Sequence, residues 1–305
     1  MNSSATLPPA ILDGASIGVF NPSEKITNER ATYLRLGAKR LQSKGWIAQF
    51  PSNNCFDEWA ELRDAVTRAE EFCAVYSNFR NSAVIAAWAG SNSADLLPHL
   101  DFHQFFKAQK PIIGYGDNCT FLNEVALRTG LITYYGPNYL GKLNLLSDRA
   151  MERGFKQIGR GCVIELKSQF SAFSTPHVQG RLIGGSLRSF WNHFSDFERL
   201  SLVDTPAILF FETASLNLKG LEKILCEIRD SRLFRLLSGV VIGQTKLITP
   251  EDALRVVIDR FGRRVAVLKC DDFGHSGADN PALPVGSMVT LSSNARLNIL
   301  ETKVR

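Results

Sequence analysis

In the first half of this sequence, short apolar runs that end in turns of small residues alternate with helical stretches. Three of these runs have the length and composition of buried strands: 15–20, 83–88 and 111–115. Helical patterns cover 29–43 and 58–78. Strands that alternate with helices predict a parallel sheet with helices on both faces. Because binding sites in such sheets lie beyond the carboxyl ends of the strands, the small-residue turns at 89–93 and 116–118 are the first candidates for a site.

The pattern changes near the middle of the chain. The segment 167–180 is rich in Ser, Thr and Pro and is predicted to be a linker. Beyond it, apolar strands and amphipathic helices resume. We therefore expect a Rossmann-like N-terminal domain with a parallel sheet at 1–166 and a smaller C-terminal α/β or β-rich domain at 181–305.

Composition narrows the class of protein. The 305 residues carry a net charge of +5, but the basic residues are scattered, and the longest basic cluster is the pair Arg263–Arg264. A nucleic-acid-binding protein concentrates Lys and Arg on one face or arm, so no nucleic-acid partner is expected. No apolar stretch reaches 18 residues and the N-terminus lacks a signal-peptide pattern, which predicts a cytoplasmic protein without membrane contact.

Cysteine and metal-site patterns point the same way. The six cysteines never have C-x-x-C spacing, and we interpret them as reduced, mostly buried thiols. There is no metal-ligand cluster, no P-loop and no dinucleotide-binding spacing, so we expect neither a metal nor another cofactor.

Two titratable residues stand out as candidates for proton transfer. Glu212 follows the apolar strand 207–211, where a carboxylate is costly unless it is paired. His275 has Gly274 before it and a glycine two residues after it, which leaves the imidazole accessible. From local sequence alone, a Glu that exits into solvent and an inert loop His are the commoner readings. Cys119, one turn into a predicted helix, is assigned a packing role, because an elbow nucleophile sits at the turn itself.

Several motifs in order resemble the LD-carboxypeptidases and the related microcin-immunity peptidases, which are serine peptidases that cleave amide bonds next to a free carboxylate. The Gly-Tyr-Ser-Asp motif around the nucleophile resembles Gly114-Tyr115-Gly116-Asp117. The other motifs that carry the resemblance are Ala89-Gly90-Ser91-Asn92-Ser93 with Leu96-Leu97-Pro98, Tyr135-Gly136-Pro137, Gly184-Gly185-Ser186-Leu187, Glu212, Gly274-His275-Ser276, and Leu283-Pro284-Val285-Gly286.

The resemblance implies roles for these positions. The nucleophilic serine corresponds to Gly116, the base to His275, and the residue that orients the base to Glu212. It also implies a homodimer. The residues expected to bind substrate or the oxyanion, the latter through the backbone N–H groups of Gly90 and Asp117, are Gly90, Ser91, Asn92, Tyr115 and Asp117.

The departures from the family pattern affect the activity. Gly116 has no side chain, so covalent catalysis by that residue is impossible. Ala89 replaces the first glycine of a pair, and Tyr135 replaces a His. Thr213 and Leu216 stand where the family commonly has Asp and Glu. A single change would fit an engineered knock-out, whereas several together indicate natural divergence.

Three functions fit this pattern. The first is a repurposed, non-hydrolytic acid/base enzyme, of cyclase, isomerase or lyase type, that uses Glu212 and His275 on a small carboxylate or peptide-like metabolite. The second is a carboxypeptidase or amide hydrolase of the family's usual kind whose nucleophile is engineered away or bypassed by a water that His275 activates. The third is a pseudoenzyme that binds a ligand without chemistry, and only this one should tolerate His275→Ala and Glu212→Ala.

Overall fold

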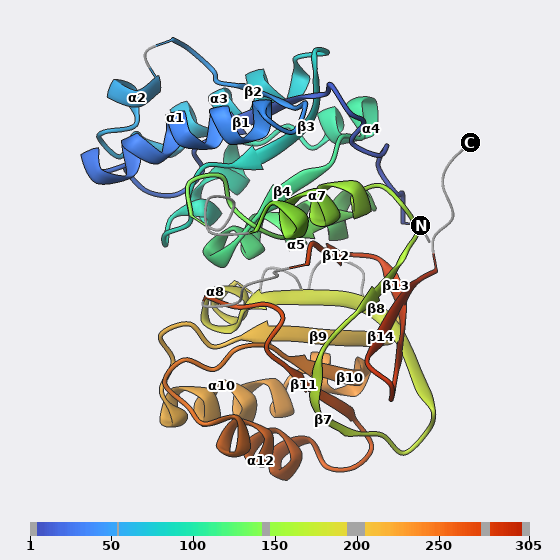
Figure 1. Ribbon diagram of the computed structural model, residues 1–305. Coiled ribbons are helices and arrows are strands. Elements are labelled where there is room, and N and C mark those ends of the chain that lie inside the picture. Colours follow the sequence, from blue (N-terminus) through green and yellow to red (C-terminus); the bar gives the residue numbers. More distant parts are fainter. Residues whose placement is uncertain (1–4, 54, 142–146, 194–204, 276–280, 301–305) are drawn as a thin grey trace.

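The computed structural model describes residues 5–53, 55–141, 147–193, 205–275 and 281–300. Within these ranges the chain forms two sheets, each covered by helices, stacked as two domains (Figure 1). The first half of the chain builds one domain and most of the second half builds the other. The predicted α/β class, with a largely parallel first sheet and a second, mixed domain, is confirmed.

The first sheet has, in the described part of the chain, the strand order β12-β5-β4-β3-β1-β2. All neighbouring pairs are parallel except β12 with β5. Its strands are β1 (Ser16–Phe20), β2 (Ile47–Gln49), β3 (Asn81–Ala86), β4 (Ile112–Gly114), β5 (Thr133–Tyr135) and β12 (Leu283–Val285).

Helices cover both faces of this sheet. Its helices are α1 (Asn28–Gln42), α2 (Cys55–Glu58), α3 (Ala65–Ser77), α4 (His103–Ala108), α5 (Cys119–Thr129), α7 (Asp148–Gln157) and the 3-10 helices η1 (Ser93–His99) and η2 (Gly116–Asn118). Successive residues of β3 separate into two cores, Ile85 packing in the core with α1 and α7, and Val84 in the core with α3 and α5. This two-sided burial explains why the strands read as continuous apolar runs.

The second sheet, within the described residues, has the order β6-β14-β13-β8-β9-β10-β11-β7. The central strands β8 to β11 are parallel, and the outer pairs are antiparallel. Its strands are β6 (Val163–Glu165), β7 (Ser168–Ala172), β8 (His177–Ser186), β9 (Ala207–Glu212), β10 (Leu237–Ile242), β11 (Ala266–Cys270), β13 (Met288–Ser292) and β14 (Arg296–Ile299). Its helices are α8 (Leu187–Asn192), α10 (Leu218–Asp230), α11 (Arg232–Leu236) and α12 (Pro250–Phe261), and α10 and α12 lie on the side away from the first domain (Figure 1).

Most strands and helices lie within a few residues of their predicted bounds, but two segments differ. The pattern at 58–78 predicts one helix, whereas α3 begins only at Ala65. The Asp64 side chain accepts a hydrogen bond from the Thr67 N–H at 2.8 Å, and this N-cap fixes the start of the helix. The acidic residues before it belong to α2 and a short irregular connection.

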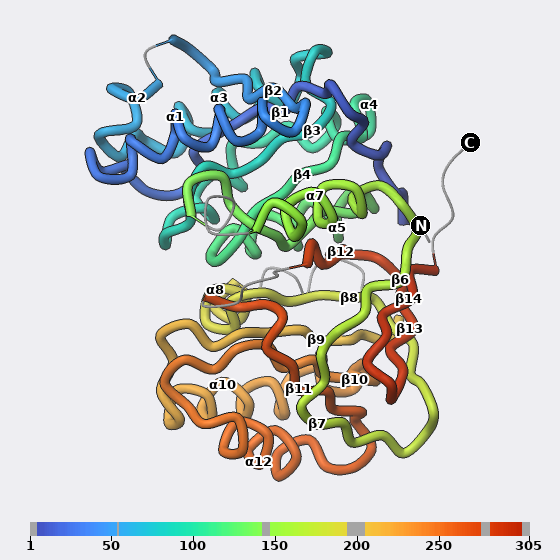
Figure 2. The backbone as a smooth tube through the Cα atoms, viewed as in Figure 1, coloured from blue at the N-terminus to red at the C-terminus, as the bar shows by residue number. Residues whose placement is uncertain are grey.

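The segment 167–180, predicted to be a linker, instead contains β7 and the start of β8. β7 is an edge strand that pairs antiparallel with β11, and four of its five residues are exposed. An edge strand with exposed Ser and Gln side chains lacks the apolar signal by which a buried strand is recognised. The chain also returns from the second half to the first sheet through β12, which lies beside α5 at the domain junction (Figure 2).

Close backbone contacts fix the two domains to each other. A Cβ added to Gly185, on β8, would lie 2.2 Å from the Cys119 Cβ on α5, so only glycine permits this approach. Next to it, the Asn123 side chain donates to the Gly184 carbonyl at 2.8 Å and accepts from the Gly184 N–H at 3.1 Å. The carboxyl ends of the strands of both sheets therefore face a common space.

Candidate active site

A pocket of about 620 Å³ lies between the two domains. The first half of the chain lines it with Trp88, Ala89, Gly90, Ser91, Tyr115, Gly116, Asp117, Asn138 and Gly141. The second half contributes Ser186, Arg188, Ser189, Thr213, Ala214, Ser215, Lys246, Leu247 and His275. Most of these residues follow the carboxyl end of a strand, which is where the alternation of strands and helices predicts a binding site.

Glu212 and His275 form a hydrogen-bonded pair in this pocket. Glu212 is the last residue of β9 and is fully buried, whereas the His275 side chain is 43% exposed. The His275 Nδ1 lies 2.9 Å from the Glu212 Oε2. Because a carboxylate only accepts, this contact places the imidazole proton on Nδ1 and leaves Nε2 free to take a proton from a ligand.

Two further donors hold the Glu212 carboxylate. The Tyr135 hydroxyl donates to Oε1 at 3.2 Å, and the Ala214 N–H donates to Oε2 at 2.8 Å. Ala214 has a φ of 43°, in the left-handed region that residues with side chains rarely adopt. The turn that follows β9 is thus shaped around the carboxylate, and the carboxylate in turn is oriented toward His275.

Gly116 occupies the strand-to-helix turn after β4, facing the same pocket. Its φ is +62°, as expected for a sharp turn that presents a residue above the sheet. A Cβ added here would lie 2.8 Å from the Ala89 Cβ, closer than two carbon atoms can approach without a shift. Ala89 and Gly116 are therefore a matched pair: the methyl group of one occupies space that a side chain on the other would need.

The Asp117 carboxylate ties the surrounding loops together. Its Oδ1 accepts from the Gly90 N–H at 2.6 Å, and its Oδ2 accepts from the Ser23 hydroxyl at 2.6 Å and the Ser93 N–H at 3.0 Å. The Gly90 N–H, expected to bind an oxyanion, is thus already engaged. The Asp117 N–H, at the start of η2, remains the backbone candidate for that role.

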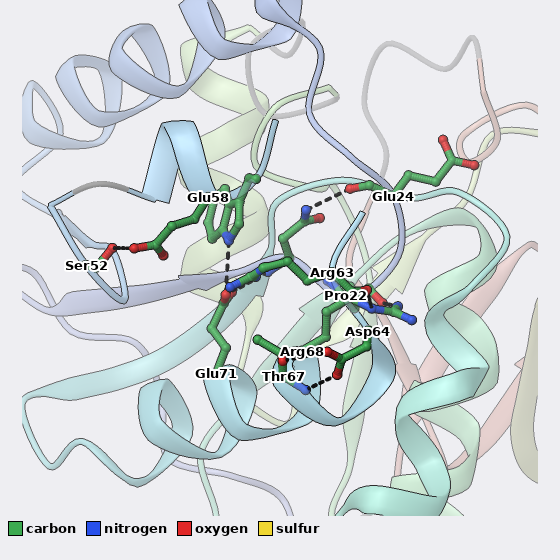
Figure 3. A network of polar contacts seen from close by, with 11 residues as sticks. Pro22, Glu24, Ser52, Glu58, Arg63, Asp64, Thr67, Arg68 and Glu71 are labelled. Atoms are coloured by element: carbon green, nitrogen blue, oxygen red, sulfur yellow. Dashed lines mark hydrogen bonds and ion pairs between the residues drawn. The ribbon is translucent and has the colours of Figure 1, made fainter. Parts of the chain in front are cut away.

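A buried polar network supports these loops from behind (Figure 3). The Glu71 carboxylate accepts from the Asn21 N–H and the Trp59 indole N–H, each at 3.0 Å, and forms an ion pair with Arg63. The Arg68 guanidinium donates to the Pro22 carbonyl and, at 3.0 Å, to the Asn92 carbonyl. These contacts therefore hold in place the wall of the pocket that the first half of the chain builds.

The remaining predicted site residues differ in where they lie. Tyr115 lines the pocket, and its ring meets the His275 ring edge-on at 5.3 Å. Ser91 also lines it. Asn92, predicted to bind substrate, is not among the lining residues, because its N–H donates to the Ser23 hydroxyl at 3.1 Å and its side chain to the Ser23 carbonyl at 3.3 Å. Ser276, part of the histidine motif, lies outside the described residues.

Burial keeps the neighbouring phenol and thiol groups protonated. It raises the pKa of the Tyr115 and Tyr135 phenols well above the usual value, and the Glu212 carboxylate adds to both effects. Burial also raises the pKa of the Cys119 thiol, with a further contribution from Asp117. The Cys119 thiol donates to the Ser186 carbonyl at 3.7 Å, which agrees with the packing role predicted for it.

Sequence patterns missed several lining residues. Arg188 and Lys246 are exposed cations at the pocket, and neither pairs with a carboxylate of the described residues. Thr213, noted in the sequence only as a departure from the family pattern, lies beside Glu212, and Trp88 carries the Arg30 guanidinium over its ring at 4.2 Å. Each lies within four residues of a strand's carboxyl end, so the strand ends are the one signal that could have found them.

The described parts of the chain contain neither a metal-binding cluster nor a membrane-spanning helix. There, no group of three or more His, Cys, Asp or Glu residues is arranged to hold a metal ion. No described helix is both long enough and apolar enough to cross a membrane.

The pocket thus brings together the turn at Gly116 and the hydrogen-bonded pair Glu212–His275. Comparison with known families identifies the class: residues 17–136 match the LD-carboxypeptidase N-terminal domain, and residues 179–291 match the LD-carboxypeptidase C-terminal domain. The chain belongs to the LD-carboxypeptidase family, as its motifs predict.

Individual relatives agree. The chain is 24% identical to the microcin C7 self-immunity protein MccF of Escherichia coli, over 94% of each chain. It is 22% identical to a putative carboxypeptidase of Vibrio cholerae, over 82% of this chain and 83% of that protein. The fold is that of MccF bound to aspartyl sulfamoyl adenosine, with a TM-score of 0.82 at 22% identity over 99% of this chain and 100% of the other. An MccF-like protein from Bacillus anthracis gives a TM-score of 0.80 at 23% identity, over 98% and 100% of the two chains.

Proposed function

We propose that the protein is an acid/base enzyme that acts on a small carboxylate or peptide-like molecule in the interdomain pocket and forms no acyl-enzyme. The observation that carries this proposal is the 2.9 Å contact between His275 and Glu212 beside a residue without a side chain, Gly116. Membership of the LD-carboxypeptidase family supports peptidase-type or related chemistry.

The acid/base half of the site determines what is chemically available. His275 takes a proton through Nε2, and the buried Glu212 carboxylate stabilises the imidazolium that forms. The Asp117 N–H is the proposed donor to a developing oxyanion. Cyclisation, isomerisation, dehydration and elimination each need only proton transfer and charge stabilisation of this kind.

The wall at Gly116 favours a non-hydrolytic reaction over hydrolysis. Where a serine CH2OH group would stand, the Ala89 methyl group fills part of the space. A methyl group offers no hydrogen bond to position an attacking water. Direct abstraction of a proton from the ligand by His275 is therefore the first candidate.

Hydrolysis by a water that His275 activates is the second candidate, since the relatives include a putative carboxypeptidase and an immunity protein solved with a sulfamoyl adenosine. For either reaction, the exposed cations Arg188 and Lys246 suit an anionic substrate group. The predicted cytoplasmic location and homodimer belong to the same proposal.

The test is to incubate the protein in H2(18)O with aspartyl sulfamoyl adenosine, with peptides ending in D-alanine and with a cell metabolite extract, and to follow products by mass spectrometry. The proposal expects a product that H275A does not form and that carries no (18)O. Incorporation of (18)O would establish the hydrolytic candidate instead. Turnover that persists in both H275A and E212Q would refute an acid/base role for the pair, whereas ligand binding without any turnover in the parent protein would indicate a ligand-binding protein.

A further inference from the structure

The Thr213 hydroxyl is a buried polar group without a partner in the protein. Thr213 is only 1% exposed, and among the described residues no atom forms a hydrogen bond with its Oγ1. It nevertheless lines the interdomain pocket, directly after Glu212. Because a buried hydroxyl that makes no hydrogen bond destabilises a folded protein, such a group at a pocket wall indicates that a ligand supplies the missing partner.

The backbone around Thr213 uses its own polar groups and leaves only the hydroxyl. The Thr213 N–H donates to the Gln244 carbonyl at 3.2 Å, and the Thr213 carbonyl accepts from the Leu216 N–H at 2.7 Å. The next residue, Ala214, is held in its left-handed conformation by the 2.8 Å bond of its N–H to Glu212. The turn therefore fixes the backbone from which the Thr213 side chain extends.

The charges around this hydroxyl favour an anion. Lys246, two residues after the Gln244 that binds Thr213, and Arg188 line the same pocket as exposed cations. The carboxylates of the pocket region, Glu212 and Asp117, are buried, and each already accepts three hydrogen bonds. A ligand near Thr213 thus meets the two exposed cations and the Thr213 hydroxyl.

We propose that Thr213 is a specificity-determining residue, whose hydroxyl donates a hydrogen bond to an anionic oxygen group of the ligand, a carboxylate or a phosphate, with Lys246 and Arg188 balancing its charge. This inference rests on the proposed function for the identity of the pocket but concerns binding only.

Calorimetric titration of the full chain with succinate, with inorganic phosphate and with neutral succinamide tests the proposal. T213V removes the hydroxyl at nearly constant shape, and T213S restores it. The matched control is T245V, since the Thr245 hydroxyl is also without a described partner but does not line the pocket. Succinate against phosphate distinguishes a carboxylate from a phosphate ligand.

We expect T213V to weaken anion binding about tenfold while T213S and T245V change it less than about twofold, which corresponds to one lost hydrogen bond to a charged group. K246Q weakens the same binding, and succinamide is bound poorly by every variant. T213V should also raise Tm in the absence of ligand, because it removes an unsatisfied buried group. A structural role for the hydroxyl would instead lower Tm.

Either of two results overturns the proposal. One is equal anion affinity in T213V and the parent protein. The other is no binding to the parent at an anion concentration about 50 times a Kd of about 1 mM. These results do not depend on turnover. Because calorimetry measures binding and mass spectrometry measures product, a failure of the proposed chemistry and a failure of this binding site are distinguishable.

Discussion

The two walls of the pocket differ in the groups that they present. On the wall from the second domain, Glu212 and His275 make a 2.9 Å contact, with two more donors on the carboxylate. On the wall from the first domain, the turn after β4 holds Gly116, which has no side chain, and the Ala89 methyl group occupies the adjacent space.

Under the proposed function, this difference teaches that the missing side chain at position 116 belongs to a local arrangement that includes Ala89 and Tyr135. Ala89 and a side chain at 116 exclude each other sterically, and Tyr135 links the two walls because it accepts from the Gly116 N–H at 3.3 Å and donates to Glu212. Under the proposed function, these features belong together in a site that works by proton transfer.

The largest expected effect tests the wall from the second domain, which carries Glu212 and His275. H275A should reduce any turnover by about 10²–10⁴-fold, the usual contribution of a general base. Its effect on folding should be small because the side chain is 43% exposed. E212Q should lose comparable activity and also stability, since the amide places a donor among the N–H and O–H groups that the carboxylate now accepts. Rates come from product formation by mass spectrometry and stability from urea unfolding. Full activity in H275A would mean that the Glu212–His275 pair takes no part in turnover.

The second prediction concerns the wall from the first domain, where a serine is introduced at position 116. G116S alone should react poorly with a fluorophosphonate because its Cβ meets the Ala89 Cβ at 2.8 Å. A89G/G116S removes that obstruction and should be labelled at least about tenfold more, a difference of about 1.4 kcal/mol in the barrier. Gel fluorescence after labelling gives the measurement, and A89G serves as the control without a nucleophile. If the double variant stays as inert as A89G, the steric pairing does not explain the missing serine.

Much of this comparison could be predicted from sequence. Glu212 was recognisable because it ends an apolar strand, and Gly116 because it follows one in a turn of small residues. Even so, local patterns alone favoured inert readings for Glu212 and His275. Only the order of several motifs linked residues 63 positions apart, because pairing across a pocket leaves no periodic signal in the chain.

Other features depended on contacts that sequence patterns do not encode. The Asp117 carboxylate binds the Gly90 N–H, which removes that group from its predicted role. The edge strand β7 carries exposed polar side chains and therefore resembled a linker. The pairing of Ala89 with Gly116 requires the distance between two loops 27 residues apart, and the exposed cations Arg188 and Lys246 become site residues only through the fold.

A smaller effect is expected at the link between the walls. Y135F removes a hydroxyl that serves both the Gly116 N–H and Glu212, and should cost about 1–2 kcal/mol of stability. The matched control is Y134F, whose hydroxyl accepts from the Gly159 N–H at 2.8 Å in the other core of the first domain. Both variants should unfold at lower urea, but only Y135F should also lower turnover. Equal turnover in the two variants would separate Tyr135 from the orientation of Glu212.

The smallest effect on activity is expected for Cys119, a buried thiol at the start of α5, directly after the turn that holds Gly116. Burial raises the pKa of its thiol well above the usual 9.0, so the folded protein keeps it protonated and unreactive. C119A should leave turnover unchanged, and iodoacetamide at pH 8 should modify the partly exposed Cys226 but not Cys119, as peptide mapping can determine. The unfolded thiol ionises above a pH of about 9 while the folded one does not, so its contribution to stability is present below that pH and is lost as the pH rises. Urea unfolding at pH 8 and pH 10 should therefore show a smaller decline in C119A than in the parent. Alkylation of Cys119 together with loss of turnover would place a working nucleophile on the first wall and end the contrast between the two.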